Sequence, residues 1–227
     1  MASQPALDIA DAPMTAPLKL VIFDFDGTLS DSGDWFLSII DDLAARYRFR
    51  TVRDDAEVEM LRKRSSREVI DYLGIPRWKL PFIARHVRAR FGRSTHEISL
   101  FPGTRALVER LASSGMRLAV VTSNAEENAR RILGPEILPH IETFECGSSL
   151  FGKAPKFRRV LKRLGVAPHE ALSIGDETRD IEAAREVGMR SAAVLWGYAS
   201  HEALGALDPE AMFATPDDIL SFVEANR

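Results

Sequence analysis

The segment over residues 20–28 constrains this chain more than any other, because a strand-like run there leads directly into two carboxylates. Residues 20–23 are branched or aromatic, which is typical of a strand buried on both faces. Side chains alternate along extended backbone, so we expect Asp24 and Asp26 to point the same way, with Phe25 opposed. Neighbouring carboxylates repel unless a cation lies between them. The segment therefore predicts a divalent metal ion bound by oxygen ligands.

Strand-like runs alternate with helical patterns along the rest of the chain. We predict strands over residues 118–122, 143–146, 171–176, 191–196 and 212–214, and helices over residues 104–113, 126–133, 156–164, 179–187 and 216–224. This alternation favours an α/β fold with a Rossmann-like, mostly parallel sheet that has helices on both faces. Ligands of such sheets bind beyond the carboxyl ends of the strands.

The interval between the first two strands is too long for one crossover helix. It contains helical patterns over residues 34–47, 55–63, 66–73 and 78–91, and nothing in it resembles a buried strand. We therefore expect an inserted all-helical cap over residues 33–99, and a catalytic core made of residues 18–32 and 100–227. Residues 1–17 lack a basic start and a continuous apolar stretch, so we expect a disordered tail there and not a secretory signal.

Composition argues against several classes of partner. A net charge of −3 gives no reason to expect nucleic acid or an anionic membrane, and no segment approaches the roughly 18 apolar residues of a membrane helix. The single cysteine, Cys146, excludes an internal disulfide and favours a reducing, cytoplasmic compartment. Its neighbours indicate an inert thiol and not a nucleophile. The sequence carries no signature of oligomeric state.

Polar residues follow the carboxyl ends of four predicted strands, which in a parallel sheet lie at one edge. In chain order they are Asp24, Asp26, Thr122, Ser123, Asn124, Lys153, Asp176 and Asp180. Hydroxyl and amide donors, an ammonium group and several carboxylates together suit a phosphoryl group beside a metal ion. Asp176 and Asp180 are spaced to share one face of a first helical turn.

These motifs resemble those of the haloacid dehalogenase-like hydrolase superfamily, and the resemblance covers nearly everything after residue 17. The matching motifs are DFDGT at 24–28, VVTSN at 120–124, the lysine at 153 and GDETRD at 175–180, in the family's order. The later segment VLWGY at 194–198 is similar to the phosphoglycolate phosphatase-like branch. Four motifs in order, each at a predicted strand end, are specific where any one alone is not.

The resemblance implies a Mg²⁺-dependent phosphatase that acts on a small phosphorylated metabolite, with phosphoglycolate among the candidates. Asp24 would attack phosphorus and form an aspartyl-phosphate. Asp26 would protonate the leaving alkoxide and then activate water. Mg²⁺ would be bound by the Asp24 carboxylate, the Asp26 backbone carbonyl and Asp176. Asp180 would either bind the ion or orient its ligands, and we favour the second role.

The resemblance also implies which groups contact the phosphoryl oxygens. Thr122 would donate its hydroxyl, helped by backbone N–H groups around Ser123 and Asn124, and Lys153 would neutralise the transferring group. The family commonly has Lys-Pro-x-Pro where this chain has KAPK, so Lys156 competes for the lysine role. We prefer Lys153, which directly follows a glycine.

The cap is expected to select the substrate. The basic segment LRKRSSRE over residues 61–68 places Arg64 and Arg67 near the predicted start of a helix, and we expect one of them to contact a substrate anion. The alternative is a solvated basic face. Two other functions stay open, a phosphomutase acting on a sugar phosphate and a non-catalytic phospholigand-binding protein. The complete set of nucleophile, acid/base and metal ligands weighs against the last.

Overall fold

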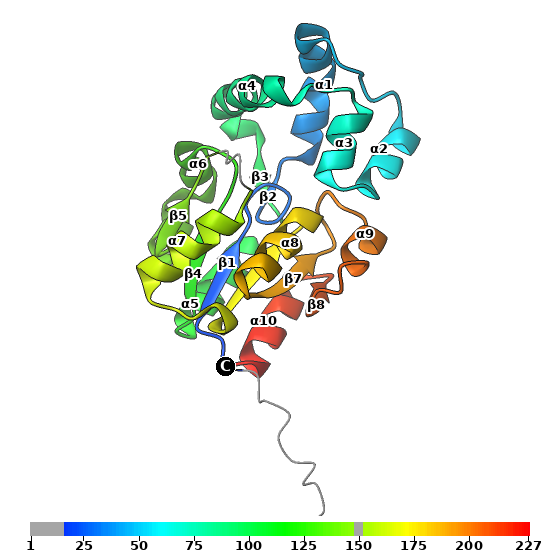
Figure 1. Ribbon diagram of the computed structural model, residues 1–227. Coiled ribbons are helices and arrows are strands. Elements are labelled where there is room, and N and C mark those ends of the chain that lie inside the picture. The colour runs from blue at the N-terminus through cyan, green and yellow to red at the C-terminus, as the bar shows by residue number, and fades with distance from the viewer. Residues whose placement is uncertain (1–15, 148–151) are drawn as a thin grey trace, which may run out of the picture.

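The computed structural model describes residues 16–147 and 152–227, which form an α/β core with a helical cap above one end of its sheet (Figure 1). The tail predicted over residues 1–17 therefore lies, except for its last two residues, outside the described residues. The core sheet has six strands in the order β5-β4-β1-β6-β7-β8, and every neighbouring pair is parallel. This confirms the predicted Rossmann-like α/β class.

The sheet brings three strand ends to one edge. Its strands are β1 (Leu20–Phe23), β4 (Arg117–Val121), β5 (Thr143–Glu145), β6 (Ala171–Gly175), β7 (Arg190–Val194) and β8 (Ala211–Phe213). Phe23, the last residue of β1, pairs with Val120 on one side and Ile174 on the other. Because the pairing is parallel, the segments that follow β1, β4 and β6 leave the sheet side by side.

Helices cover both faces of the sheet. They are α5 (Thr104–Ser113), α6 (Glu126–Ile137), α7 (Ala154–Leu164), α8 (Thr178–Val187), the short α9 (His201–Gly205) and α10 (Pro216–Ala225). Val21 and Phe23 pack with α5, α6 and α10, whereas Leu20 and Ile22 pack with α7 and α8. Burial on both faces explains the continuous apolar run of β1. Within residues 16–147 and 152–227, no helix is both long and apolar enough to span a membrane.

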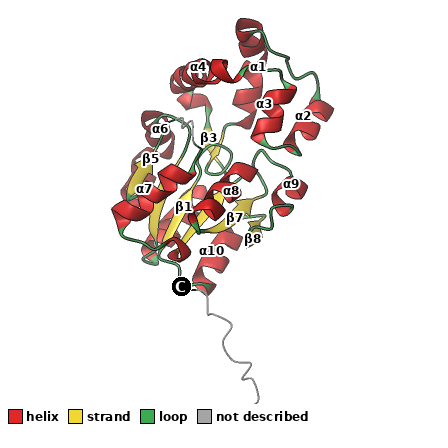
Figure 2. Ribbon diagram, in the orientation of Figure 1, coloured by secondary structure: helices red, strands yellow, loops and turns green. Residues whose placement is uncertain are grey.

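The cap is built from helices, as the colouring of Figure 2 shows, and it has its own small core. Its helices are α1 (Gly33–Tyr47), α2 (Asp55–Arg62), α3 (Ser66–Tyr72) and α4 (Leu80–Arg93). Trp35 of α1 packs edge-on against Phe91 of α4, with ring centroids 4.8 Å apart. This contact joins the first and last cap helices, so the cap closes on itself.

A two-stranded antiparallel ribbon carries the chain into the cap and back. It consists of β2 (Ser30–Asp31) and β3 (Ser99–Leu100). The sequence pattern missed this ribbon, because two residues are too few to show alternation. It lies where we predict the boundary between core and cap, and that boundary stays a prediction.

Candidate active site

Three carboxylates converge at the carboxyl edge of the sheet. Oxygen atoms of Asp24, Asp176 and Asp180 all lie within 4.8 Å of one another, and the three residues are buried. Asp24 follows β1, Asp176 follows β6, and Asp180 lies in the first turn of α8. Parallel pairing of β1 with β6 therefore joins two motifs that are far apart in the sequence.

Two glycines allow the chain to approach this cluster closely. Gly27 has φ of +80°, and a Cβ atom there would lie 2.2 Å from Asp176 Oδ2. A Cβ atom on Gly197 would lie 2.1 Å from the Cβ of Asp176. Both positions therefore require glycine to leave room for Asp176, and Gly27 requires it for its backbone conformation as well.

Lys153 is the lysine that lies among the carboxylates. Its ammonium group is 2.7 Å from Asp24 Oδ2 and also forms an ion pair with Asp180. Burial favours the neutral amine, but these two carboxylates raise the pKa of Lys153 above its usual value, which keeps it charged. Lys156 instead donates to the backbone carbonyl of Thr122, at 2.5 Å, and to a second carbonyl. Its contacts cross-link the chain beside the site.

Asp176 is oriented by neutral donors. Its Oδ1 accepts a hydrogen bond from the Thr28 hydroxyl at 2.8 Å, and its Oδ2 accepts one from the Tyr198 backbone N–H at 2.9 Å. Within the described parts of the chain, Asp176 forms no ion pair. These two bonds hold the carboxylate in one orientation and leave lone pairs on both oxygens for another partner.

The cluster carries more negative charge than its lysine neutralises. Burial raises the pKa of Asp24 to about 7, and burial raises the pKa of Asp176 well above its usual value. Both raised pKa values mean that the negative charges of these carboxylates are poorly neutralised by the groups around them. Closely spaced carboxylate oxygens are the ligands that hard divalent cations prefer. The donor set therefore fits a divalent cation such as Mg²⁺ beside Asp24, Asp176 and Asp180.

Asp26 lies among a different set of partners. The Asn124 side-chain amide donates to its two carboxylate oxygens at 3.1 and 3.2 Å, the Ser32 hydroxyl donates at 3.3 Å, and the Thr122 hydroxyl donates at 3.4 Å. Burial raises the pKa of Asp26, although the bonds from Asn124 and Ser32 oppose the shift. A raised pKa makes this carboxyl easier to protonate, which suits it to proton transfer.

A turn, and not strand alternation, places Asp26. The strand β1 ends at Phe23, and the Phe25 carbonyl then accepts backbone N–H groups of Leu29 and Ser30, both at 2.9 Å. Phe25 is buried in the core, as expected from its opposed position. The two aspartates of the motif therefore follow the strand within a tight turn and reach different neighbours.

The segment after β4 contains Thr122, Ser123 and Asn124, whose contact with a phosphoryl group stays a prediction. Thr122 is fully buried, and its hydroxyl accepts the backbone N–H of Asn124 at 2.9 Å. Ser123 is exposed, and its carbonyl accepts a hydrogen bond from Arg88 of the cap at 3.5 Å. Asn124 is buried and holds Asp26 as described above. The structure thus gives Asn124 an orienting contact that its motif did not signal.

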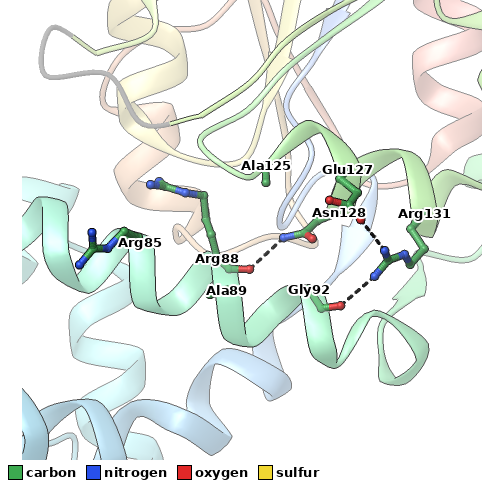
Figure 3. A pocket seen from close by; sticks show the side chains of 8 residues that line it. All are labelled: Arg85, Arg88, Ala89, Gly92, Ala125, Glu127, Asn128 and Arg131. Atoms are coloured by element: carbon green, nitrogen blue, oxygen red, sulfur yellow. Dashed lines mark hydrogen bonds and ion pairs between the residues drawn. The ribbon is translucent and has the colours of Figure 1, made fainter.

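A cleft of about 400 Å³ lies between the cap and the core (Figure 3). It is lined by Arg85, Arg88, Ala89 and Gly92 of α4, and by Ala125, Glu127, Asn128 and Arg131 at the start of α6. Glu127, the acidic residue of this lining, pairs with Arg131 at 2.7 Å. Figure 3 shows Arg85 and Arg88 extending away from that pair. Burial lowers the pKa of Arg88. The cleft is therefore a positively charged opening next to the site.

The arginines predicted from the basic segment lie elsewhere on the cap. The Arg64 guanidinium lies over the Tyr72 ring, 4.9 Å from its centroid, and Arg67 is exposed on α3. Arg62 instead donates to the backbone carbonyl of Gly197 at 3.1 Å, next to the acidic cluster. Substrate contacts by Arg64 and Arg67 stay predictions.

Sequence reasoning assigned no role to three residues that orient the carboxylates. Thr28 and Tyr198 lie inside motifs already recognised at 24–28 and 194–198, and that membership was a signal for both. Ser32 carried no signal beyond its place at the start of the cap. All three act through contacts between distant parts of the chain or across a turn, which periodicity does not report.

Comparisons with known proteins show the family of this chain. Residues 21–194 match the profile of the family described as haloacid dehalogenase-like hydrolase. A phosphoglycolate phosphatase of Synechococcus elongatus is 31% identical over 207 residues, which cover 91% of this chain and 97% of that protein. A protein described as a predicted phosphatase from Clostridium acetobutylicum has a similar structure, with a TM-score of 0.78, 21% identity, and coverage of 92% of this chain and 100% of that chain. CbbY from Rhodobacter sphaeroides, solved in complex with phosphate, has a TM-score of 0.71 at 21% identity and covers 91% of this chain and 99% of its own.

Proposed function

This chain belongs to the haloacid dehalogenase-like hydrolase family, as a phosphatase of its phosphoglycolate phosphatase-like branch, and we propose that it hydrolyses a small phosphomonoester through an aspartyl-phosphate on Asp24. The observation that carries the mechanism is the division of the carboxylates into two environments. Asp24 lies with Lys153 in the acidic cluster, whereas Asp26 lies among neutral donors. One carboxylate is thereby suited to attack and the other to proton transfer.

In the proposed reaction, an oxygen of Asp24 attacks phosphorus and the ester oxygen leaves. Lys153 holds that carboxylate in place and balances charge that collects on the phosphoryl oxygens. Asp26 gives a proton to the departing oxygen, and then takes one from the water that attacks the aspartyl-phosphate. The raised pKa of Asp26 supports the first of these roles, because burial favours the protonated carboxyl that this step requires.

Mg²⁺ is the cofactor we propose, bound by Asp24 and Asp176 with the backbone carbonyl of Asp26. When bound, it would add positive charge beside the phosphoryl oxygens. Thr28 and Tyr198 orient Asp176 for this role. Asp180 pairs with Lys153 and accepts the Glu177 backbone N–H at 3.1 Å. These contacts support an orienting role for Asp180.

The arginine-lined cleft supports a substrate with a second anionic group. Arg88 contacts the Ser123 carbonyl, one residue from Thr122, whose hydroxyl we propose contacts the phosphoryl group. Neither Arg85 nor Arg88 forms an ion pair within residues 16–147 and 152–227, so their charge is available to a ligand. A carboxylate on the substrate would be bound there, which agrees with a phosphoglycolate-like ester.

The direct test is phosphate release from a panel of phosphate esters by the purified protein, with Mg²⁺ and with EDTA. We expect activity with Mg²⁺ alone, and a loss of at least roughly 100-fold in Asp24→Asn, because the amide is a poor nucleophile. Asp217→Asn, which makes the same change at an exposed aspartate of α10, is the matched control. An inactive protein, or an Asp24→Asn variant that keeps its activity, would refute the phosphatase mechanism.

Two alternatives are decided by the same panel. A phosphomutase would convert a sugar phosphate without net release of phosphate. A non-catalytic phospholigand-binding protein would bind the esters but turn none over. The separate, hydrogen-bonded environment of Asp26 favours the hydrolase over the binding protein, because a relic site has no need to hold an acid/base in place.

The source of substrate selection can be tested with a matched pair of esters, phosphoglycolate and 2-hydroxyethyl phosphate, which differ in one carboxylate. We expect Arg88→Ala to lower kcat/KM on phosphoglycolate about tenfold or more, because the variant loses a charge-assisted hydrogen bond to the substrate carboxylate. The value of kcat/KM on 2-hydroxyethyl phosphate, which lacks that carboxylate, should be nearly unchanged. Arg64→Ala and Arg67→Ala test the basic segment in the same assay. Equal losses on both esters would contradict recognition of the second anion by the altered residue.

A further inference from the structure

Tyr198 reaches the site in two ways. Its backbone N–H donates to Asp176 at 2.9 Å. Its phenol oxygen is 2.7 Å from the Ser32 hydroxyl, and Ser32 in turn donates to Asp26 at 3.3 Å. One residue therefore touches the acidic cluster through its main chain and approaches the separate acid/base through its side chain. The motif at 194–198 had no assigned role beyond resemblance.

The hydrogen-bond chain runs in one direction. Ser32 has a single hydroxyl proton, and in the structure it donates that proton to Asp26. Tyr198 must then donate its own hydroxyl proton to the Ser32 oxygen. A hydroxyl that accepts one hydrogen bond donates the next one more strongly. Tyr198 thus strengthens and aims the bond from Ser32 to Asp26.

The Ser32 hydroxyl binds Asp26 and Tyr198 at the expense of a hydrogen bond that would stabilise α1. Ser32 is the N-cap residue of α1, where a serine side chain usually accepts a hydrogen bond from the helix. Here its side chain makes no capping bond. The hydroxyl is bound to Asp26 and Tyr198 instead, and the helix gives up a stabilising contact at the entrance to the cap.

We propose that Ser32 and Tyr198 are positioning residues, which hold the Asp26 carboxyl in the orientation needed to protonate the leaving oxygen. The inference rests on the proposed phosphatase function, and it extends that function to the hydroxyl groups of these two residues. Because Ser32 directly precedes α1, the same contact ties the orientation of Asp26 to the point where the chain enters the cap.

The test compares two esters that differ in their need for an acid. An alkyl phosphate expels a basic alkoxide that requires protonation, whereas p-nitrophenyl phosphate expels a stable phenolate. The parameter is kcat/KM, because it covers only the steps up to departure of the leaving group. We expect Ser32→Ala and Tyr198→Phe each to lower it about tenfold on 2-hydroxyethyl phosphate, and less than about threefold on the aryl ester.

Three further variants separate positioning from simple loss of packing. Ser32→Thr keeps the hydroxyl, so its kcat/KM on the alkyl ester should return toward that of the unaltered protein, in contrast to Ser32→Ala. Tyr198→Phe should add nothing in the Ser32→Ala background, since both act through one chain. Ser30→Ala is the matched control: it removes a buried hydroxyl two residues away that has no hydrogen-bond partner within the described residues, and it should leave both esters unaffected.

Several results would overturn the proposal. They are equal losses on the alkyl and aryl esters, no loss on either, or additive effects of the two substitutions. Failure of the proposed function is distinguishable, because the unaltered protein would then release no phosphate from any ester. The urea midpoint of each variant verifies that the fold is kept, so that a change in the ratio between the two esters reports on Asp26.

Discussion

Removal of the site lysine tests whether charge balance governs the stability of the acidic cluster. Lys153→Met keeps the length and the apolar stem of the side chain but deletes the ammonium group. The side chain is 7% exposed and lies 2.7 Å from Asp24 Oδ2, with a second ion pair to Asp180. Removing one partner of a buried ion pair typically costs about 3–5 kcal/mol, because the other charge is left uncompensated.

We therefore expect Lys153→Met to lower the free energy of unfolding by about 3–5 kcal/mol in EDTA at neutral pH. Urea denaturation followed by tryptophan fluorescence measures this quantity, and the chain has three tryptophans as reporters. Lys162→Met is the matched control, because Lys162 is an exposed lysine of α7, the helix that Lys153 directly precedes. Its effect should lie within about 0.5 kcal/mol.

A double variant makes the reasoning refutable. Adding Asp180→Asn to Lys153→Met removes one of the carboxylates left without a cation, so the double variant should be more stable than the single one. The asparagine oxygen can still accept the Glu177 N–H. A loss under about 1 kcal/mol in Lys153→Met, or no recovery on adding Asp180→Asn, would show that the buried charges are compensated by something other than Lys153.

Three other predictions follow from the same geometry. Gly197→Ala would place a Cβ atom 2.1 Å from the Cβ of Asp176, so we expect kcat/KM to fall about 100-fold. Gly205→Ala is the control and should be nearly neutral, because its Cβ would meet only Met212, at 3.7 Å. Equal activity of the two variants would contradict the steric argument. In EDTA, the free energy of unfolding should fall as pH rises from 3.8 to about 7 and then level off, because burial raises the folded-state pKa of Asp24 from 3.8 to about 7. Between these two values the folded protein binds more protons than the unfolded chain, so each rise in pH costs stability. A flat profile from pH 5 to 8 would refute this, and Mg²⁺ should remove the decline. Cys146 should react with iodoacetamide roughly 1,000-fold more slowly at pH 8.5 than a free thiol, because burial raises the pKa of its thiol to about 12. Labelling as fast as in the urea-unfolded protein would contradict this, since it would show that the thiol is accessible and ionised.

Much of the core could be predicted because its signals are local. The run of residues 20–23 is apolar throughout, which reports burial on both faces, and the alternation of strands with helices is what a parallel sheet requires. The predicted strands agree with the observed ones to within one or two residues at their ends. The ribbon of β2 and β3 was missed, since elements of two residues carry no periodicity.

The choice between the two candidate lysines shows how far local reasoning extends. Both lie in the segment KAPK, and the preference for Lys153 rested on its position after a glycine. In the structure Lys153 reaches two carboxylates, whereas Lys156, in the first turn of α7, reaches a carbonyl at the end of β4. Only the packing of α7 against the sheet separates these destinations.

Contacts between distant segments could not be predicted from the pattern of apolar and polar residues. Tyr198 and Ser32 are 166 residues apart, and Thr28 and Asp176 are 148 apart. Arg88 meets Ser123 only because the cap lies against the start of α6. No property of either segment alone reports such a pair, since the contact depends on how the cap and two strand ends are placed relative to one another.

The sequence by itself determined the kinds of groups that follow the strands and the edge of the sheet at which they are expected, because the alternation of strands with helices already predicts a parallel sheet. Only the tertiary structure decided how those groups are divided. The register of β1 against β6 brings Asp24 to Asp176 and Asp180, while the turn after β1 sends Asp26 to Asn124 and Ser32. The two aspartates are adjacent in one motif, but their chemical environments come from opposite neighbours of the strand, and burial beside those neighbours sets what each carboxyl can do.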